Sequence, residues 1–350
     1  MKNITYLLGA GASYHSLPLL ATMNNRLNAY STYLKIAIRE GVIKNEFALQ
    51  FVTELDKLIK AAHESTSIDA YAKELSNSNK HLELLHLKAL LSSYLIFEQL
   101  VKPEDFKLYV DESKSNEYDK VTSEMITTHL DKRYRTFWGN YATNKGIITP
   151  NVRILSWNYD MQLEFSFSRY SQFSLEYVQQ ELQVFPSEQK KVNLDKFCIL
   201  KLNGTAGLLD TYGNSTFTNL FDLNKHHLNS NNLNYLIDIL KDNYYRAFSN
   251  PVFSFAWENK GVAKKTRELA KTVIETSDIL VIIGYSFPSF NRDIDRSLFK
   301  DLGRLDKVYY QAPQQELNYL KYQAIGVNNE FENKIIGIPI LDSFYIPPEF

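Results

Sequence analysis

Residues 279–288, Ile-Leu-Val-Ile-Ile-Gly-Tyr-Ser-Phe-Pro, begin with the strongest indication of a buried strand in this chain. Their first five residues form a continuous apolar run rich in β-branched side chains, which is typical of a parallel strand covered on both faces. The run ends at Gly284 and Ser286, small residues that suit a loop. The sequence therefore predicts a buried strand with a tight loop at its carboxyl end.

Strand-like and helix-like segments alternate on both sides of this strand. Further strands are expected at 4–8, 152–156, 197–202 and 307–310, and helices at 45–63, 82–100, 223–248 and 262–276. This alternation predicts an α/β fold, a Rossmann-like parallel sheet with helices on both faces and a large helical insertion. We expect one domain over 1–350, with a mostly helical insertion at 17–150, the remaining core at 151–313 and a C-terminal extension at 314–350.

Composition excludes several classes of protein. The 350 residues are 44% hydrophobic with a net charge of -1, which argues against disorder and against a surface that coats nucleic acid. The one cysteine, Cys198, rules out an internal disulfide and Cys-rich zinc sites. No His/Asp/Glu spacing fits a metal, and the adjacent pair His226-His227 would point in different directions on a helix. Without a membrane-spanning run or a signal peptide, the chain is expected to be cytoplasmic.

Small or amide residues follow four of the predicted strands. They are Gly9–Ser13, Asn158–Asp160, Asn203-Gly204 and Gly284–Ser286. Ligands of open α/β sheets bind at the carboxyl ends of strands, so the four segments are expected to converge. The Gly9–Ser13 turn suits a phosphate at a helix start, or else a tight turn that needs small residues. Tyr14 stands where a dehydrogenase fingerprint needs a third glycine, which argues against an ordinary nicotinamide dehydrogenase.

In their order, these segments resemble the motifs of the sirtuins, and more closely those of bacterial sirtuin-like, NAD-hydrolysing domains of antiphage defence proteins. The resemblance implies NAD as the substrate, with no metal. It places the pyrophosphate on Gly9, Ala10, Gly11, Ala12 and Ser13, and the adenosine half on Gly284, Ser286 and Asn291. It also implies that Asn158 orients a water or a ribose hydroxyl and that Asp160 lies on the nicotinamide side.

One position departs from the family pattern. Its Leu-His-Gly appears here as Leu202-Asn203-Gly204, so the histidine that acts as general base is replaced by an amide. Loss of a general base typically costs a factor of roughly 10²–10⁴. Deacetylation depends on that base and is disfavoured, whereas nicotinamide departs as a neutral molecule and needs less help. The expected activity is an NAD+ glycohydrolase with Asn158, Asn203 and Asp160 as catalytic residues; the alternative is a catalytically inactive NAD- or ADP-ribose-binding module of a defence complex.

The resemblance also implies a context. Defence by NAD depletion requires an enzyme that is silent at rest, so we expect a homo-oligomer, a separate regulatory protein such as a DNA-translocating ATPase, or both. No direct sequence-specific nucleic-acid binding and no membrane association are expected.

Several residues admit two interpretations. His15 could replace the missing base or cap a helix, and Arg133 could reach a phosphate or form an ion pair. Residues 255–258 could line a pocket or belong to the core, and Asn291 or Asp293 could cap a helix.

Overall fold

The computed structural model describes residues 2–19, 22–65, 67–100, 129–143, 147–187, 191–211, 216–219, 234, 237–238 and 249–350. It divides the chain into two compact units. The first unit comprises Met1–Tyr14, Leu130–Thr205 and Ser254–Phe350, and the second comprises His15–His129 and Ala206–Phe253.

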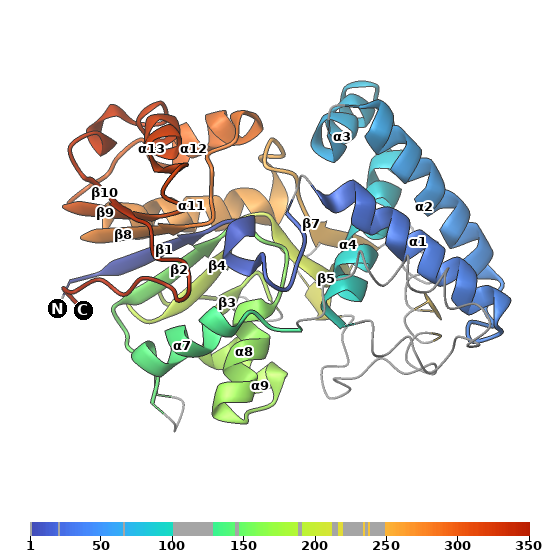
Figure 1. The fold of residues 1–350 in the computed structure, drawn as a ribbon, viewed down its shortest axis with the longest axis horizontal. Coiled ribbons are helices and arrows are strands. Elements are labelled where there is room, and N and C mark those ends of the chain that lie inside the picture. The colour runs from blue at the N-terminus through green and yellow to red at the C-terminus, as the bar shows by residue number, and fades with distance from the viewer. Residues whose placement is uncertain are drawn as a thin grey trace. The chain divides into compact units, whose positions relative to one another are not determined.

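A seven-stranded sheet forms the centre of the first unit (Figure 1). Its strands are β1 Ile4–Leu8, β2 Val152–Ser156, β3 Val184–Phe185, β4 Cys198–Lys201, β8 Ile279–Ile283, β9 Lys307–Gln311 and β10 Ile335–Ile338. Their order in the sheet is β10-β9-β8-β1-β2-β4-β3, and every pairing is parallel. The central strand β1 pairs with both β2 and β8, so that Tyr6 lies opposite Ile154 on one side and Val281 on the other.

Helices cover both faces of this sheet, as Figure 1 shows. They are α7 Lys132–Tyr141, α8 Gln162–Ser171, α9 Leu175–Glu181, α11 Gly261–Glu275, α12 Arg292–Leu298 and α13 Leu317–Ile325. On one face, Leu7 and Leu280 share a buried cluster with Ile274 of α11. On the other, the ring of Tyr6 contacts Phe137 and Tyr141 of α7. Burial on both faces explains the continuous apolar strands, and the predicted Rossmann-like α/β fold is confirmed.

Residues 314–350, expected as an extension, contribute α13, a 3-10 helix (η6, Asn329–Phe331) and β10. Neither β10 nor β3 was predicted from the sequence, because β3 has two residues and β10 contains Gly337. The strand expected at 197–202 ends at Lys201, and Leu202 and Asn203 form a turn.

Among its described residues, the second unit contains four helices and a small sheet. The elements are α1 Met23–Arg39, α2 Phe47–Glu64, α3 Ile68–Asn77, α4 His81–Leu100, β5 Gly204–Thr211, β6 Thr216–Asn219 and β7 Ser249–Phe253, with the strand order β6-β5-β7. The helices expected over 45–63 and 82–100 are confirmed as α2 and α4.

Aromatic packing and one buried ion pair hold these helices together. The ring of Tyr30 on α1 contacts Tyr94 and Phe97 of α4, and Arg26 pairs with Glu98 in the same interior. His226-His227 and most of the helix expected at 223–248 lie outside the described residues. Within the described part of the chain, no helix has the length and hydropathy needed to cross a bilayer.

Candidate functional site

Four loop segments of the first unit lie at the carboxyl ends of four neighbouring strands, β8, β1, β2 and β4. In sheet order they begin at Gly284, Gly9, Trp157 and Leu202. The chain leaves β1 toward β2 but leaves β8 toward β9, in the opposite direction. The topological switch point therefore lies between β1 and β8, which is where open α/β sheets bind their ligands.

The glycines at this switch point are required by close packing of two loops. Gly11 N donates to Gly284 O at 3.0 Å. A Cβ on Gly9 would lie 2.5 Å from Gly284 O, and a Cβ on Gly284 would lie 2.3 Å from Ala12 N. Gly284 also has a φ of +63°, a conformation that favours glycine. Backbone packing alone thus accounts for Gly9, Gly11 and Gly284.

The turn after β1 uses most of its own amide donors. Gly9 N donates to Ile283 O at 3.0 Å, and Ala12 N donates to Gly9 O at 2.9 Å. With Gly11 N also bonded, three N–H groups of the turn already have protein acceptors. The turn continues into a four-residue 3-10 helix (η1, Ala10–Ser13) and not into the expected α-helix; the next α-helix, α1, begins at Met23.

Arg133 braces this turn from α7. Its guanidinium pairs with Asp131 and donates to Gly11 O and Ala12 O, each at 3.1 Å. It also lies over the rings of Tyr14 and Phe344, at 4.5 and 5.1 Å from the ring centroids. The ion-pair interpretation of Arg133 therefore holds, and its donors are engaged with protein oxygens.

Asn158 and Asp160 connect the loop after β2 to the same turn. Asn158 Nδ2 donates to Gly9 O at 2.9 Å, while its Oδ1 has no partner among the described residues. The Asp160 carboxylate accepts from Ser13 Oγ at 3.0 Å and from Gln162 N at 3.0 Å. Asp160 and Ser13 are buried and Asn158 is half-buried. Asn158 thus keeps a free acceptor near the surface, whereas Asp160 is a buried charge that organises the loop.

A buried ion pair between Lys201 and Glu164 contacts the backbone of Asp160. Lys201, the last residue of β4, donates from Nζ to Asp160 O and pairs with Glu164 at 3.1 Å. Both side chains are buried. Burial raises the pKa of Glu164, while the charge of Lys201 opposes that rise.

Asn203 is bound by an arginine that the sequence did not indicate. Arg267 Nη2, from α11, donates to Asn203 Oδ1 at 2.7 Å, and Ser254 N donates to Asn203 O at 2.8 Å. The guanidinium also lies 5.7 Å from the ring centroid of Trp157, the first residue of the loop after β2. Arg267 therefore links Asn203 to Trp157 in the loop after β2.

Asn291 belongs to a buried polar network and not to a helix cap. Its Nδ2 donates to Tyr285 Oη at 2.9 Å, and Tyr285 donates to Asp295 at 2.8 Å. No side-chain bond caps α12, which ends the capping interpretation of Asn291. Burial raises the pKa of Asp295 to about 8, with the hydrogen bond from Tyr285 opposing the shift.

Two buried polar atoms beside Tyr285 have no hydrogen-bond partner within the described part of the chain. They are Asn291 Oδ1, an acceptor, and Trp157 Nε1, a donor. Trp157 stacks on Tyr285 with 5.7 Å between ring centroids. Leaving such an atom unsatisfied costs about 1–3 kcal/mol.

The other predicted binding residues differ in accessibility. Ala10 and Ser286 are exposed, Gly11 and Gly284 are half-buried, and Gly9 and Ala12 are buried. Residues 255–258 surround part of the Arg267 side chain, since Phe255 O and Glu258 O accept hydrogen bonds from its guanidinium at 3.3 and 2.7 Å.

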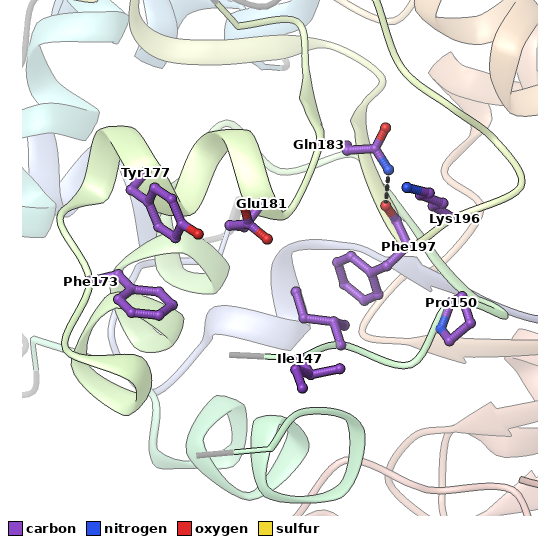
Figure 2. A pocket seen from close by; sticks show the side chains of 9 residues that line it. Ile147, Pro150, Phe173, Tyr177, Glu181, Gln183, Lys196 and Phe197 are labelled. Atoms are coloured by element: carbon purple, nitrogen blue, oxygen red, sulfur yellow. Dashed lines mark hydrogen bonds between the residues drawn. The ribbon is translucent and has the colours of Figure 1, made fainter. Parts of the chain in front are cut away.

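A cavity of about 580 Å³ lies at the opposite, amino-terminal ends of β2, β3 and β4. Figure 2 shows Tyr177 and Glu181 of α9 on one wall and Lys196 and Phe197 on the other. No predicted site residue lines it. It is therefore separate from the switch point.

No group of three or more His, Cys, Asp or Glu side chains that could hold a metal occurs among the residues that the structure describes. Sequence reasoning missed Arg267, Tyr134 and Asp295. Tyr134, which contacts Ser13 Oγ at 2.9 Å, lay in a stretch already noted for Arg133. The chain matches no protein-family model, and comparisons with curated proteins and with solved structures also find no match.

Proposed function

We propose that this chain is an NAD+ hydrolase that cleaves the nicotinamide–ribose bond at the carboxyl edge of the first unit's sheet. The reaction consumes NAD+ and water and yields nicotinamide, ADP-ribose and a proton. Support comes from the motif resemblance together with the placement of all four motif segments after adjacent strands at a topological switch point.

The observation that carries the proposal is the fixed orientation of Asn158. Gly9 O can only accept, so the Asn158 NH₂ group must face it and Oδ1 must face away. A half-buried, unpartnered amide oxygen can accept a hydrogen bond from a ribose hydroxyl or from the attacking water. Orienting that water is the contribution a hydrolase needs from this position.

The chemistry tolerates the loss of the family's general base. Nicotinamide leaves a pyridinium as a neutral molecule, and the ribose passes through an oxocarbenium-like transition state. Water that attacks such a cation needs little activation, by analogy with glycoside cleavage. The buried carboxylate of Asp160 adds negative charge, which favours a cationic transition state.

Recognition of the dinucleotide would fall to residues beside the switch point. Ribose hydroxyls both donate and accept hydrogen bonds, and they could bond the buried Asn291 Oδ1 and Trp157 Nε1 if the loops around Tyr285 moved apart. The exposed Ala10 and Ser286 flank the point where the two loops meet. Because the N–H groups of Gly9, Gly11 and Ala12 are already bonded, the turn's role in this proposal is to shape the edge.

A second candidate, a non-catalytic module that binds NAD or ADP-ribose, is favoured by one observation. Asn203 stands where the family has its base, and its oxygen is occupied by Arg267. An amide held in this way can bind a ligand but cannot take a proton near neutral pH. Both candidates share the same ligand and differ in turnover.

The cellular role follows from the resemblance alone. We propose a bacterial antiphage function in which infection triggers NAD depletion in the cytoplasm. Control would come from homo-oligomerisation, from a separate regulatory protein such as a DNA-translocating ATPase, or from both. A lone monomer that is active at all times would contradict this part of the proposal.

The test is nicotinamide release from NAD+ by the purified protein, beside Asn158→Ala and a matched control, Asn140→Ala. Asn140 is exposed on α7, and among the described residues its side chain bonds only Thr136 O of the same helix. We expect turnover in the natural protein and the control, and a fall of roughly 10²-fold in Asn158→Ala. Binding of ADP-ribose without turnover would leave two candidates, the binding module and a hydrolase that is silent without its regulatory partner. Neither binding nor turnover would refute both candidates.

A further inference from the structure

Arg267 is a buried cation whose hydrogen bonds converge on the residue at the family's base position. It lies within α11, 64 residues after Asn203 in the chain, and its side chain is almost fully enclosed. Nε donates to Leu202 O at 3.1 Å, Nη1 to Glu258 O at 2.7 Å, and Nη2 to Asn203 Oδ1 at 2.7 Å. The guanidinium thus grips both the backbone and the side chain of the turn after β4.

We propose that Arg267 is a positioning residue which holds Asn203 as a hydrogen-bond donor toward the ligand. A guanidinium has donors and no acceptor, so the atom that it contacts must be the amide oxygen of Asn203. The NH₂ group, which has no partner among the described residues, is then the only part of this side chain left to bond a ligand. This inference rests on the proposed function and adds a role for a residue outside the four motifs.

The charge of Arg267 also explains why an amide suits position 203. The acceptors of Arg267 are carbonyl and amide oxygens; in the described ranges the carboxylates of Glu258 and Asp295 act on its charge without forming an ion pair with it. A histidine at 203 would gain a second positive charge beside this guanidinium each time it took a proton. Like charges so close together in a buried setting oppose one another. A neutral donor avoids that repulsion.

Arg267 acts on the site through Asn203 in this proposal and not through general packing. Its contact with the face of Trp157, at 5.7 Å, would be kept in part by any long side chain. The hydrogen bond to Asn203 Oδ1 would not. Methionine at 267 therefore preserves bulk and removes the amide's anchor, whereas lysine preserves the charge and one donor.

The experiment is a double-mutant cycle on nicotinamide release with Arg267→Met, Asn203→Ala and the two combined. We expect each single variant to lower kcat by about 10- to 100-fold, the range for losing a hydrogen bond to a charged group, with a smaller change in KM. The double variant should be no slower than Asn203→Ala, because Arg267 has nothing left to position. Arg267→Lys should recover part of the lost kcat.

Lys264→Met is the matched control, since Lys264 is exposed on the same helix and, within the described part of the chain, its side chain makes only a 3.9 Å pair with Glu268. Full additivity of the two losses in kcat would overturn the inference and leave the proposed function standing. If Arg267→Met fails to fold, the cycle is run with Arg267→Lys.

If the natural protein shows no turnover on its own, the same cycle is measured on the affinity for ADP-ribose. Non-additive losses of affinity would retain the role of Arg267 in a binding module. Additive losses, or no binding by the natural protein, would overturn that role as well.

Discussion

Replacing Gly284 by alanine tests whether the two loops at the switch point touch as closely as the structure has them. The new Cβ would lie 2.3 Å from Ala12 N and 2.3 Å from the carbonyl carbon of Gly11. Ordinary van der Waals contact begins at 3.4 Å, so the loops must separate by about 1.1 Å. Both neighbours are backbone atoms, which cannot turn aside as a side chain could.

Three costs combine in this variant. A left-handed backbone costs an alanine about 1–2 kcal/mol, and overpacking adds about 1–3 kcal/mol. Separation of the loops also stretches the 3.0 Å bond from Gly11 N to Gly284 O, whose loss costs about 1 kcal/mol. The free energy of unfolding should therefore fall by about 3–6 kcal/mol.

Gly261→Ala is the matched control. Gly261 has a similar φ of +55°, but a Cβ there would meet nothing within 4 Å. Its cost should be the conformational part alone, about 1–2 kcal/mol. Urea unfolding followed by tryptophan fluorescence is the assay, because Trp138, Trp157 and Trp257 all lie in the first unit. Equal losses in the two variants would refute the close approach of the loops.

Three further predictions concern buried titratable groups. The pKa of Asp295 is raised from 3.8 to about 8, so between these pH values the folded state keeps a proton that the unfolded chain releases. The free energy of unfolding should therefore fall as the pH rises through this window, by up to about 1.4 kcal/mol per pH unit. Urea midpoints between pH 4 and pH 8 should show a shallower fall for Asp295→Asn, and an unchanged slope would contradict the burial of this proton. Glu164→Gln should lower the free energy of unfolding by about 3–5 kcal/mol, because Lys201 keeps a buried, unpaired charge. Replacing Glu164 by Leu and Lys201 by Met together should cost less. A double variant as unstable as Glu164→Gln would argue against the ion pair. Burial raises the pKa of the Cys198 thiol to about 12, so a thiol reagent at pH 8 should label it only after unfolding, and rapid labelling of the folded protein would show that β4 is accessible.

The sheet could be predicted because its strands are buried on both faces. Residues 279–283 and 152–156 read as strands since neither face meets water, and their neighbours in the sheet are equally apolar. The loops that follow them could be placed at one edge of the sheet, because the carboxyl ends of parallel strands lie at the same edge. Ser13 and Asp160, 147 residues apart, are joined there by a hydrogen bond.

Contacts made by helices could not be predicted in this way. Arg267 lies on an amphipathic helix with three nearby lysines, and no local pattern distinguishes it from a solvated arginine. Its burial depends on where α11 packs on the sheet, which is a tertiary fact. The edge strand β10 was missed because Gly337 interrupts its apolar run and its side chains are only partly buried.

Packing explains the glycines of the switch point, whereas two buried polar atoms beside Tyr285 have no hydrogen-bond partner among the described residues. Gly9, Gly11 and Gly284 would be needed even if nothing were bound, since any Cβ at these positions meets backbone at 2.3–2.7 Å. Asn291 Oδ1 and Trp157 Nε1, by contrast, have no hydrogen-bond partner within the described residues, and leaving each one unsatisfied costs about 1–3 kcal/mol. Both lie against Tyr285, directly after the strand that borders the switch point. Because both atoms are buried, a ligand at this edge of the sheet could bond them only after the loops around Tyr285 move apart.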